Sequence, residues 1–243
     1  MLWALERQDE AVDAFRTLLK DEPAAAVERF DDIYIAGLLK TRTMPTPLRR
    51  RSRLVRLIEL LAQTRSAQGD IVECGCYRGM SSYMMCSYLR EWNSGFTGHG
   101  YHIFDSFQGL SEPTEDDSIP EGWKNAEGLR RMTQPGSFAA SLAEVSAHLD
   151  DFPGIAFHPG WIPLTFKRLP ETRYRFVHVD VDLYDPTLDA LGYFYPRLAP
   201  GGILVSDDYS WPGARTATHE YVSEQGIALE ITEQNQAVLR KPV

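Results

Sequence analysis

Cysteine is scarce in this sequence, and long uncharged apolar runs are absent. Cys74, Cys76 and Cys86 are the only cysteines in 243 residues. This odd, closely spaced set offers no disulfide framework and favours a reducing, cytoplasmic location. The longest stretch without an acidic or basic residue is 152–166, and its three prolines exclude a membrane-spanning helix. The opening MLWALERQDE lacks a basic segment followed by an apolar one, so we expect no secretion signal.

Positive charge is also in short supply. Lysine and arginine total 25 against 34 acidic residues, which gives a formal net charge of −9. This balance argues against nucleic acid or an anionic membrane as the main partner. With 43% apolar and 24% charged residues, the composition excludes collagen, coiled coils and wholesale disorder. The length fits one large α/β domain.

Hydrophobic periodicity predicts a helical N-terminal region followed by alternating strands and helices. Residues 1–64 are expected to form a helical cap of the same domain, with a proline-containing loop at 41–47 between helices at 11–20 and 48–62. Further helices are expected at 81–92, 138–149, 186–198 and 215–224, and strands at 71–74, 101–104, 155–158, 176–182 and 202–206. Residues 227–231 and 237–240 predict a closing hairpin. This alternation predicts a mostly parallel sheet, covered by helices on both faces, with ligands bound at the carboxyl ends of the strands.

Two of these strand ends carry residues that suit a nucleoside ligand. Gly75 and Gly79 bracket a tight turn after the first strand, where a ligand can approach the backbone. Asp105 follows the second strand, and its carboxylate can accept two hydrogen bonds from ribose hydroxyls. Each feature alone could be an ordinary turn or a helix cap. Together they are much more specific.

Acidic residues follow two later strands. His178, Asp180 and Asp182 alternate with valines, so on a strand they share one face. Asp207 and Asp208 follow the next strand, which should be adjacent because a single helix joins the two. Three carboxylates at one sheet edge, from Asp180, Asp207 and Asp208, would suit Mg²⁺ or Mn²⁺. The alternative is that Asp207 or Asp208 only caps the following helix.

Other tempting features favour ordinary structural roles. Cys74 and Cys76 lack a second ligand pair, so we expect buried small residues rather than a metal site. The six histidines have no zinc-motif spacing, and His178 and His219 are better explained as structural residues than as acid–base groups. The acidic run at 112–121 is interpreted as a solvated loop or a mobile lid.

Four segments in combination resemble the macrocin O-methyltransferase (TylF-type) family. They are ECGCYRG at 73–79, FDSFQGL at 104–110, HVDVDLY at 178–184, and PGG at 200–202 with DDY at 207–209. The resemblance covers roughly residues 65–225. It implies a class I fold dependent on S-adenosylmethionine (SAM) in residues 65–243, dependence on Mg²⁺, and often an oligomer. The family methylates sugar hydroxyls on natural products, which implies a small, glycosylated acceptor.

The resemblance also implies roles for individual residues. Asp180, Asp207 and Asp208 would ligate Mg²⁺, and Asp180 would act as the general base. Cofactor-binding residues would be Glu73, Gly75, Tyr77, Gly79, Ser81, Asp105 and Ser106, with Asp105 on the ribose hydroxyls. Tyr77 and Met80 stand where the family often has a tryptophan and a second glycine.

Two other functions remain open at this point. Asp180-Val181-Asp182 also spells the D-x-D of glycosyltransferases that use a metal and a nucleotide sugar, although Gly75 and Asp105 would then have no role. A non-catalytic binding protein with the same fold would gain nothing from clustered carboxylates. A catechol-like diol would satisfy the same metal site as a sugar.

Overall fold

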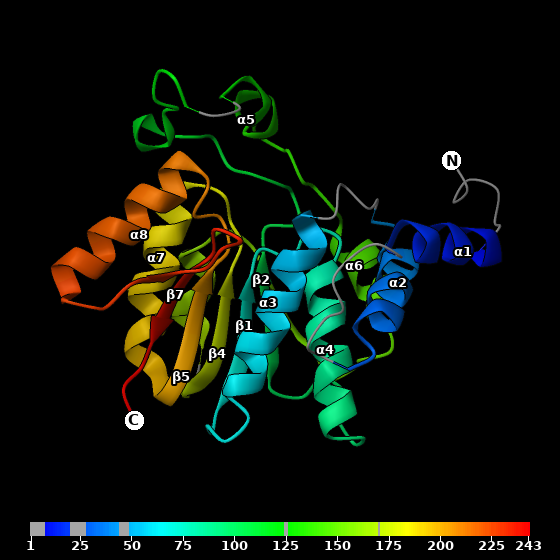
Figure 1. The fold of residues 1–243 in the computed structure, drawn as a ribbon. Coiled ribbons are helices and arrows are strands. Elements are labelled where there is room, and N and C mark those ends of the chain that lie inside the picture. Colours follow the sequence, from blue (N-terminus) through cyan, green and yellow to red (C-terminus); the bar gives the residue numbers. More distant parts are fainter. Residues whose placement is uncertain (1–7, 20–27, 44–48, 124–125, 170) are drawn as a thin grey trace.

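The computed structural model describes residues 8–19, 28–43, 49–123, 126–169 and 171–243. Seven strands form one sheet in the order β3-β2-β1-β4-β5-β7-β6 (Figure 1). The parallel strands are β1 (Asp70–Cys74), β2 (Tyr101–Asp105), β3 (Ala156–Pro159), β4 (Tyr174–Val179) and β5 (Leu198–Ser206). The expected hairpin, β6 (Glu230–Ile231) and β7 (Ala237–Arg240), is confirmed, and β7 pairs antiparallel with β5.

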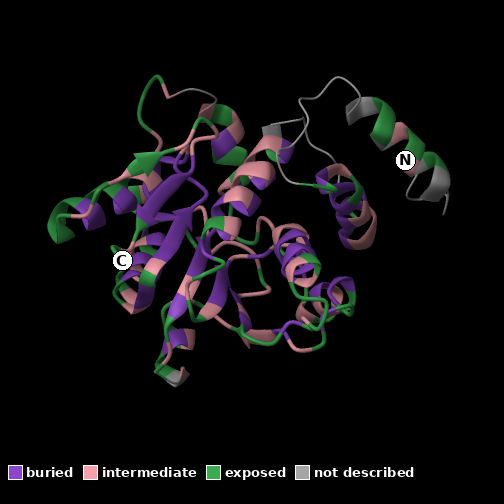
Figure 2. Ribbon diagram, turned by 60° about the horizontal axis from the view of Figure 1, so that its bottom comes forward, coloured by how far each residue is buried: buried purple, intermediate pink, exposed green. Residues whose placement is uncertain are grey.

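Eight α-helices lie within the described residues, and most of them cover the two faces of the sheet. They are α1 (Gln8–Leu19), α2 (Phe30–Thr41), α3 (Arg49–Gln63), α4 (Met80–Trp92), α5 (Ala126–Met132), α6 (Leu142–His148), α7 (Tyr184–Phe194) and α8 (Pro212–Gln225). The strands β1, β2, β4 and β5 are buried along most of their length, whereas the helices expose their outer sides (Figure 2). No helix in this described part combines the length and the apolar character that crossing a bilayer requires.

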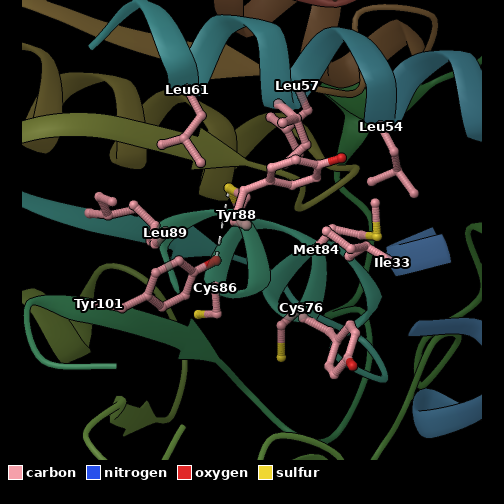
Figure 3. Packing of buried hydrophobic residues seen from close by; sticks show 14 of the residues in the cluster. Ile33, Leu54, Leu57, Leu61, Cys76, Met84, Cys86, Tyr88, Leu89 and Tyr101 are labelled. Atoms are coloured by element: carbon pink, nitrogen blue, oxygen red, sulfur yellow. Dashed lines mark hydrogen bonds between the residues drawn. The ribbon is translucent and has the colours of Figure 1, made fainter. Parts of the chain in front are cut away.

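One face of the sheet is covered by helices α3, α4 and α6, and α2 packs against α4 (Figure 1). On α3, Leu54, Leu57 and Leu61 recur at helical spacing, are almost fully buried, and point from α3 toward α4 (Figure 3). The same apolar core reaches the sheet at Tyr101. Each such buried leucine contributes roughly 1.5–3 kcal/mol, so α3 is firmly joined to this face.

The other face is covered by α7 and α8. Alternate residues of the same strands point here, including Val72 of β1 and Val177 of β4, and they pack on Leu191 and Phe194 of α7. The helix α7 begins at Tyr184, two residues before the expected start, so Asp185 and Pro186 lie inside its first turn rather than at its cap and first position. The amide of Tyr184 in that turn donates to Asp117, 2.7 Å away, so the acidic segment after β2 is tied to this helix.

Several predicted boundaries are wrong. β4 ends at Val179 rather than Asp182, and β5 begins at Leu198, with Pro200–Gly202 inside it opposite a register shift. The helix predicted from residue 138 begins only at Leu142, because Ser141 caps it by accepting from the Glu144 amide. Helices α2 and α5 were not predicted as separate elements. Of the predicted loop at 41–47, residues 44–47 lie outside the described residues.

Candidate functional site

The carboxyl ends of β1, β2, β4 and β5 open into one large cavity of about 780 Å³. Its inner side is formed by the turns that follow these strands, and its outer side by the segment that carries α5. In Figure 1 this segment lies beyond the ends of the strands, beside α8. Four predicted cofactor residues line the cavity, namely Gly75, Tyr77, Asp105 and Ser106. The acids Asp180, Asp182, Asp207 and Asp208 line it as well.

The turn after β1 depends on glycine. Gly75 has φ +81°, and a Cβ atom there would lie only 1.9 Å from the carbonyl oxygen of Asp180. The Asp180 amide in turn donates to the Cys74 carbonyl at 2.8 Å. This close approach brings the turn after β1 against the turn after β4. The cofactor half and the acidic half of the cavity are therefore contiguous.

Asp105 holds two of these turns together. Its carboxylate accepts the amide of Cys76 at 2.8 Å and the amide of Phe107 at 2.7 Å. Both oxygens retain a second lone pair, which can accept a hydroxyl of a bound ligand. Ser106 beside it donates to the Gly109 carbonyl at 2.8 Å. The position fits the expected contact with ribose, which stays a prediction.

Three predicted cofactor residues do not reach this cavity. Glu73 is completely buried, and its carboxylate accepts from Ser82, from Tyr101 at 2.9 Å and from His178 at 3.0 Å. Gly79, with φ +86°, directly precedes α4 and lies next to the side chain of Leu149. Ser81 lines a second cavity of about 50 Å³ beneath α3. Any action of Glu73 on the cofactor would therefore be indirect.

The acidic residues after β4 and β5 form two overlapping groups. Asp180 lies with His178 and Asp207 in one group and with Asp182 and Asp208 in the other, with ligand atoms within 4.8 Å of one another in each. The predicted proximity of Asp180 to both Asp207 and Asp208 is thus confirmed, although the three do not form one such group. Asp182 lies beyond the strand, with φ +62°, and its amide donates to Asp208 at 3.0 Å.

Asp207 differs from its neighbours because donors already surround it. Arg53 of α3 donates to its carboxylate and to its carbonyl oxygen, and Gln236 Nε2 donates to Oδ1 at 2.6 Å. Burial opposes ionisation, but Arg53 and His178 lower the pKa of Asp207 below its usual range. Sequence reasoning missed Arg53 and Gln236, because neither belongs to a recognisable motif.

The remaining acids are destabilised as carboxylates. Burial and the charge of Asp207 raise the pKa of Asp180, and burial and Asp180 raise the pKa of Asp182 to about 8. Burial, Asp182 and Asp180 likewise raise the pKa of Asp208. A bound cation would offset the repulsion between these buried carboxylates and stabilise their ionised forms. The donor set therefore fits a divalent metal ion.

His178 adds a nitrogen to this set. Burial lowers the pKa of this fully buried histidine, but the flanking Asp207 and Glu73 more than offset it and raise the value to about 10. Cys74 and Cys76 are free and buried, as expected, and do not belong to the group of potential ligands.

The outer wall of the large cavity is apolar. Leu129 of α5 packs with Trp211 and with Phe138, and the ring of Phe138 meets Tyr77 edge-on at 5.7 Å. Trp161, after β3, is partly exposed and also lines the cavity. Sequence reasoning did not find this wall, because its members come from three segments without a shared spacing.

The chain is similar in sequence to known proteins. The family model described as macrocin-O-methyltransferase (TylF) matches residues 41–239. A curated relative is the 8-demethyl-8-(2,3-dimethoxy-alpha-L-rhamnosyl)-tetracenomycin-C 4'-O-methyltransferase of Streptomyces olivaceus. It is 36% identical over 171 residues, which are 68% of this chain and 62% of the relative. The mycinamicin III 3''-O-methyltransferase of Micromonospora griseorubida is 34% identical over 171 residues, 68% of this chain and 65% of the relative. The chain thus spans less than two thirds of the length of these two relatives.

Among solved structures, the O-methyltransferase NovP has a similar fold. Its TM-score is 0.68 at 24% identity, and the alignment covers 99% of this chain and 100% of NovP. The expected class I SAM-dependent methyltransferase fold is therefore confirmed.

Proposed function

The chain belongs to the macrocin-O-methyltransferase (TylF) family, and from this premise we propose that it transfers a methyl group from SAM to a hydroxyl of a sugar-bearing small molecule. The observation that carries the proposal is the large cavity, which places Gly75 and Asp105 beside Asp180, Asp207 and Asp208. The acceptor class is taken from the curated relatives, one of which is named for a rhamnosyl tetracenomycin.

We place the cofactor on the turns after β1 and β2. Gly75, Tyr77 and Ser106 would contact it from the cavity wall, and the free lone pairs of Asp105 would accept the ribose hydroxyls. Glu73, Gly79 and Ser81 would act by shaping the start of α4, because they do not line this cavity. SAM, when bound, supplies an electrophilic methyl group next to the acidic half of the site.

We place Mg²⁺, or Mn²⁺ in its stead, among Asp180, Asp207 and Asp208. A divalent ion bound there would lower the pKa of the acceptor hydroxyl and fix its orientation. Asp180 lies where the two acidic groups meet, so it would be both a ligand and the base that accepts the hydroxyl proton. The apolar wall of Leu129, Phe138 and Trp211 suits the non-sugar part of the acceptor.

Calorimetric titration of SAM and S-adenosylhomocysteine (SAH), each with and without Mg²⁺, tests the proposal. Micromolar binding of both is expected, followed by methylation of rhamnosylated acceptors. Absence of binding by either would contradict it. Protection from thermal unfolding by a nucleotide sugar with Mn²⁺, but not by SAM, would instead support the glycosyltransferase that the Asp180–Asp182 motif left open.

A further inference from the structure

We propose that His178 is an additional metal ligand: its Nε2 atom coordinates a divalent ion held also by Asp180 and Asp207, and Glu73 positions the ring. This inference rests on the metal-binding part of the proposed function. It changes the donor set from oxygen alone to oxygen and nitrogen. None of the sequence patterns pointed to it, because His178 has no partner histidine at zinc-motif spacing.

The first observation is an unsatisfied nitrogen. The side chain of His178 is 1% exposed, and among the described residues its Nε2 atom has no hydrogen-bond partner. The Oδ1 atom of Asp207 is 3.7 Å away from this nitrogen, which is too far for a hydrogen bond. A buried polar atom left without a partner costs about 1–3 kcal/mol. An ion between this nitrogen and the carboxylates removes that cost.

The second observation is geometric. Ligand atoms of His178, Asp180 and Asp207 all lie within 4.8 Å of one another. Atoms that each sit about 2.1 Å from one ion are separated by up to about 4.2 Å, so small side-chain rotations complete the site. All three residues also line the small cavity of about 50 Å³ beneath α3. This volume has room for an ion and a water molecule.

The third observation is the support around the ligands. Glu73 Oε1 lies 3.0 Å from His178 Nδ1, and its other oxygen accepts from Tyr101 and Ser82. A carboxylate that accepts the Nδ1 proton fixes the ring and turns the Nε2 lone pair toward the metal, as in many protein metal sites. Asp207 is likewise oriented by Gln236. Both ligands are thus held before an ion arrives.

The charges favour a cation at the same point. Five carboxylates lie in or beside the small cavity, against three guanidinium groups, those of Arg50, Arg53 and Arg78, and Arg78 is paired with Glu144. The carboxylates on either side of His178 attract any positive charge placed at Nε2, and a divalent ion neutralises them more fully than a proton does. An imidazole ligand shifts the preference from Mg²⁺ toward Mn²⁺ and other transition metals.

Electron spin echo spectroscopy on the full-length protein loaded with Mn²⁺ tests this inference. We expect a ¹⁴N modulation from a directly bound imidazole in the wild type. It should be lost in His178→Gln and retained in His148→Gln, a matched change of a buried histidine that bonds Arg78 instead. Direct titration should show Mn²⁺ binding at least tenfold tighter than Mg²⁺ in the wild type, with that ratio reduced in His178→Gln. Bound Mn²⁺ without nitrogen modulation, or modulation that survives in His178→Gln, would overturn the inference.

His178→Gln changes a fully buried residue, so a second series guards against a variant that fails to fold. Single changes to glutamine at the other five histidines should each leave the modulation intact: His99, His102, His148, His158 and His219. Loss of the modulation in any of these would overturn the assignment. Failure to bind Mn²⁺ at all would overturn the metal part of the proposed function as well, whereas SAH binding tests the methyltransferase function independently.

Discussion

On each face of the sheet, a carboxylate of β1 contacts a histidine, but a histidine pKa is raised on one face and lowered on the other. Glu73 points toward the face covered by α3 and α4 and holds His178, while Asp70 points to the opposite face and contacts His102 at 3.2 Å. Next to His102 lies His158, whose Nε2 is 3.1 Å from His102 Nδ1. We call these the Glu73 face and the Asp70 face.

Their surroundings decide the charge of the histidine. On the Glu73 face, a single buried imidazole lies between two carboxylates, and they raise the pKa of His178 to about 10 despite burial. On the Asp70 face, two imidazoles share one carboxylate. Burial and the neighbouring His102 lower the pKa of His158 to about 4, and its ring stacks on Phe104. The same residue types thus build a cation-attracting site on one face and, on the other, a stacked pair of histidines in which the charged form of His158 is disfavoured.

The largest expected effect separates the faces by function. Asp180→Asn, next to the Glu73 face, should reduce turnover about 10³-fold, because it removes both a metal ligand and the proposed base. Binding of SAH should stay within a few-fold of the wild type. Asp70→Asn on the other face is the matched control and should leave turnover within about twofold. Near-normal turnover in Asp180→Asn would refute the role of Asp180.

Removing the β1 carboxylate should also separate the faces by stability. Glu73→Ala leaves His178, Tyr101 and Ser82 without their buried acceptor, and should cost about 3–5 kcal/mol of unfolding free energy in urea titrations. Asp70→Ala should cost no more than about 1 kcal/mol, because that carboxylate is 35% exposed. Equal losses of unfolding free energy in Glu73→Ala and Asp70→Ala would show that burial does not make the Glu73 contact the stronger of the two.

An intermediate effect on stability is expected when the Arg53 guanidinium of α3 is removed. Arg53→Gln removes the guanidinium from Asp207, so in the absence of metal the unfolding free energy should fall by about 1–3 kcal/mol. The affinity for Mn²⁺ should rise several-fold, because the ion no longer competes with Arg53. Arg56→Gln, on the same helix but in a more exposed pair with Glu230, should change stability by about 0.5 kcal/mol or less.

The sequence predicted most of this site at the level of strand ends. The adjacency of β4 and β5 followed from a single connecting helix, so Asp180 was correctly expected close to Asp207 and to Asp208. In the structure, parallel pairing of β1 with β2 brings Asp105 beside the first turn. These contacts depend on the order of strands and helices along the chain, and hydrophobic periodicity in the sequence predicts that order.

Contacts made by long side chains from distant segments were not predictable. Arg53 and Gln236 meet at Asp207 from positions separated by 183 residues. The burial of Glu73 was missed because the motif suggests a ligand contact, whereas its position within β1 directs it into the core. Alternation on β4 also failed beyond Val179, where Asp182 adopts a left-handed conformation.

The smallest expected effect lies on the Asp70 face and concerns pH. The pKa of His158 is about 4 in the folded protein and about 6.5 in an unfolded chain. Between these values the unfolded state binds more protons, so stability is fully present above about pH 6.5 and is lost as the pH falls toward 4. Solvent screening of the partly buried ring should limit this share to about 1 kcal/mol. Urea titrations at pH 7 and pH 5 should therefore show a smaller pH-dependent loss in His158→Gln than in the wild type. The same loss in both proteins would mean that folding does not lower the pKa of His158, and the contrast between the two faces would then fail.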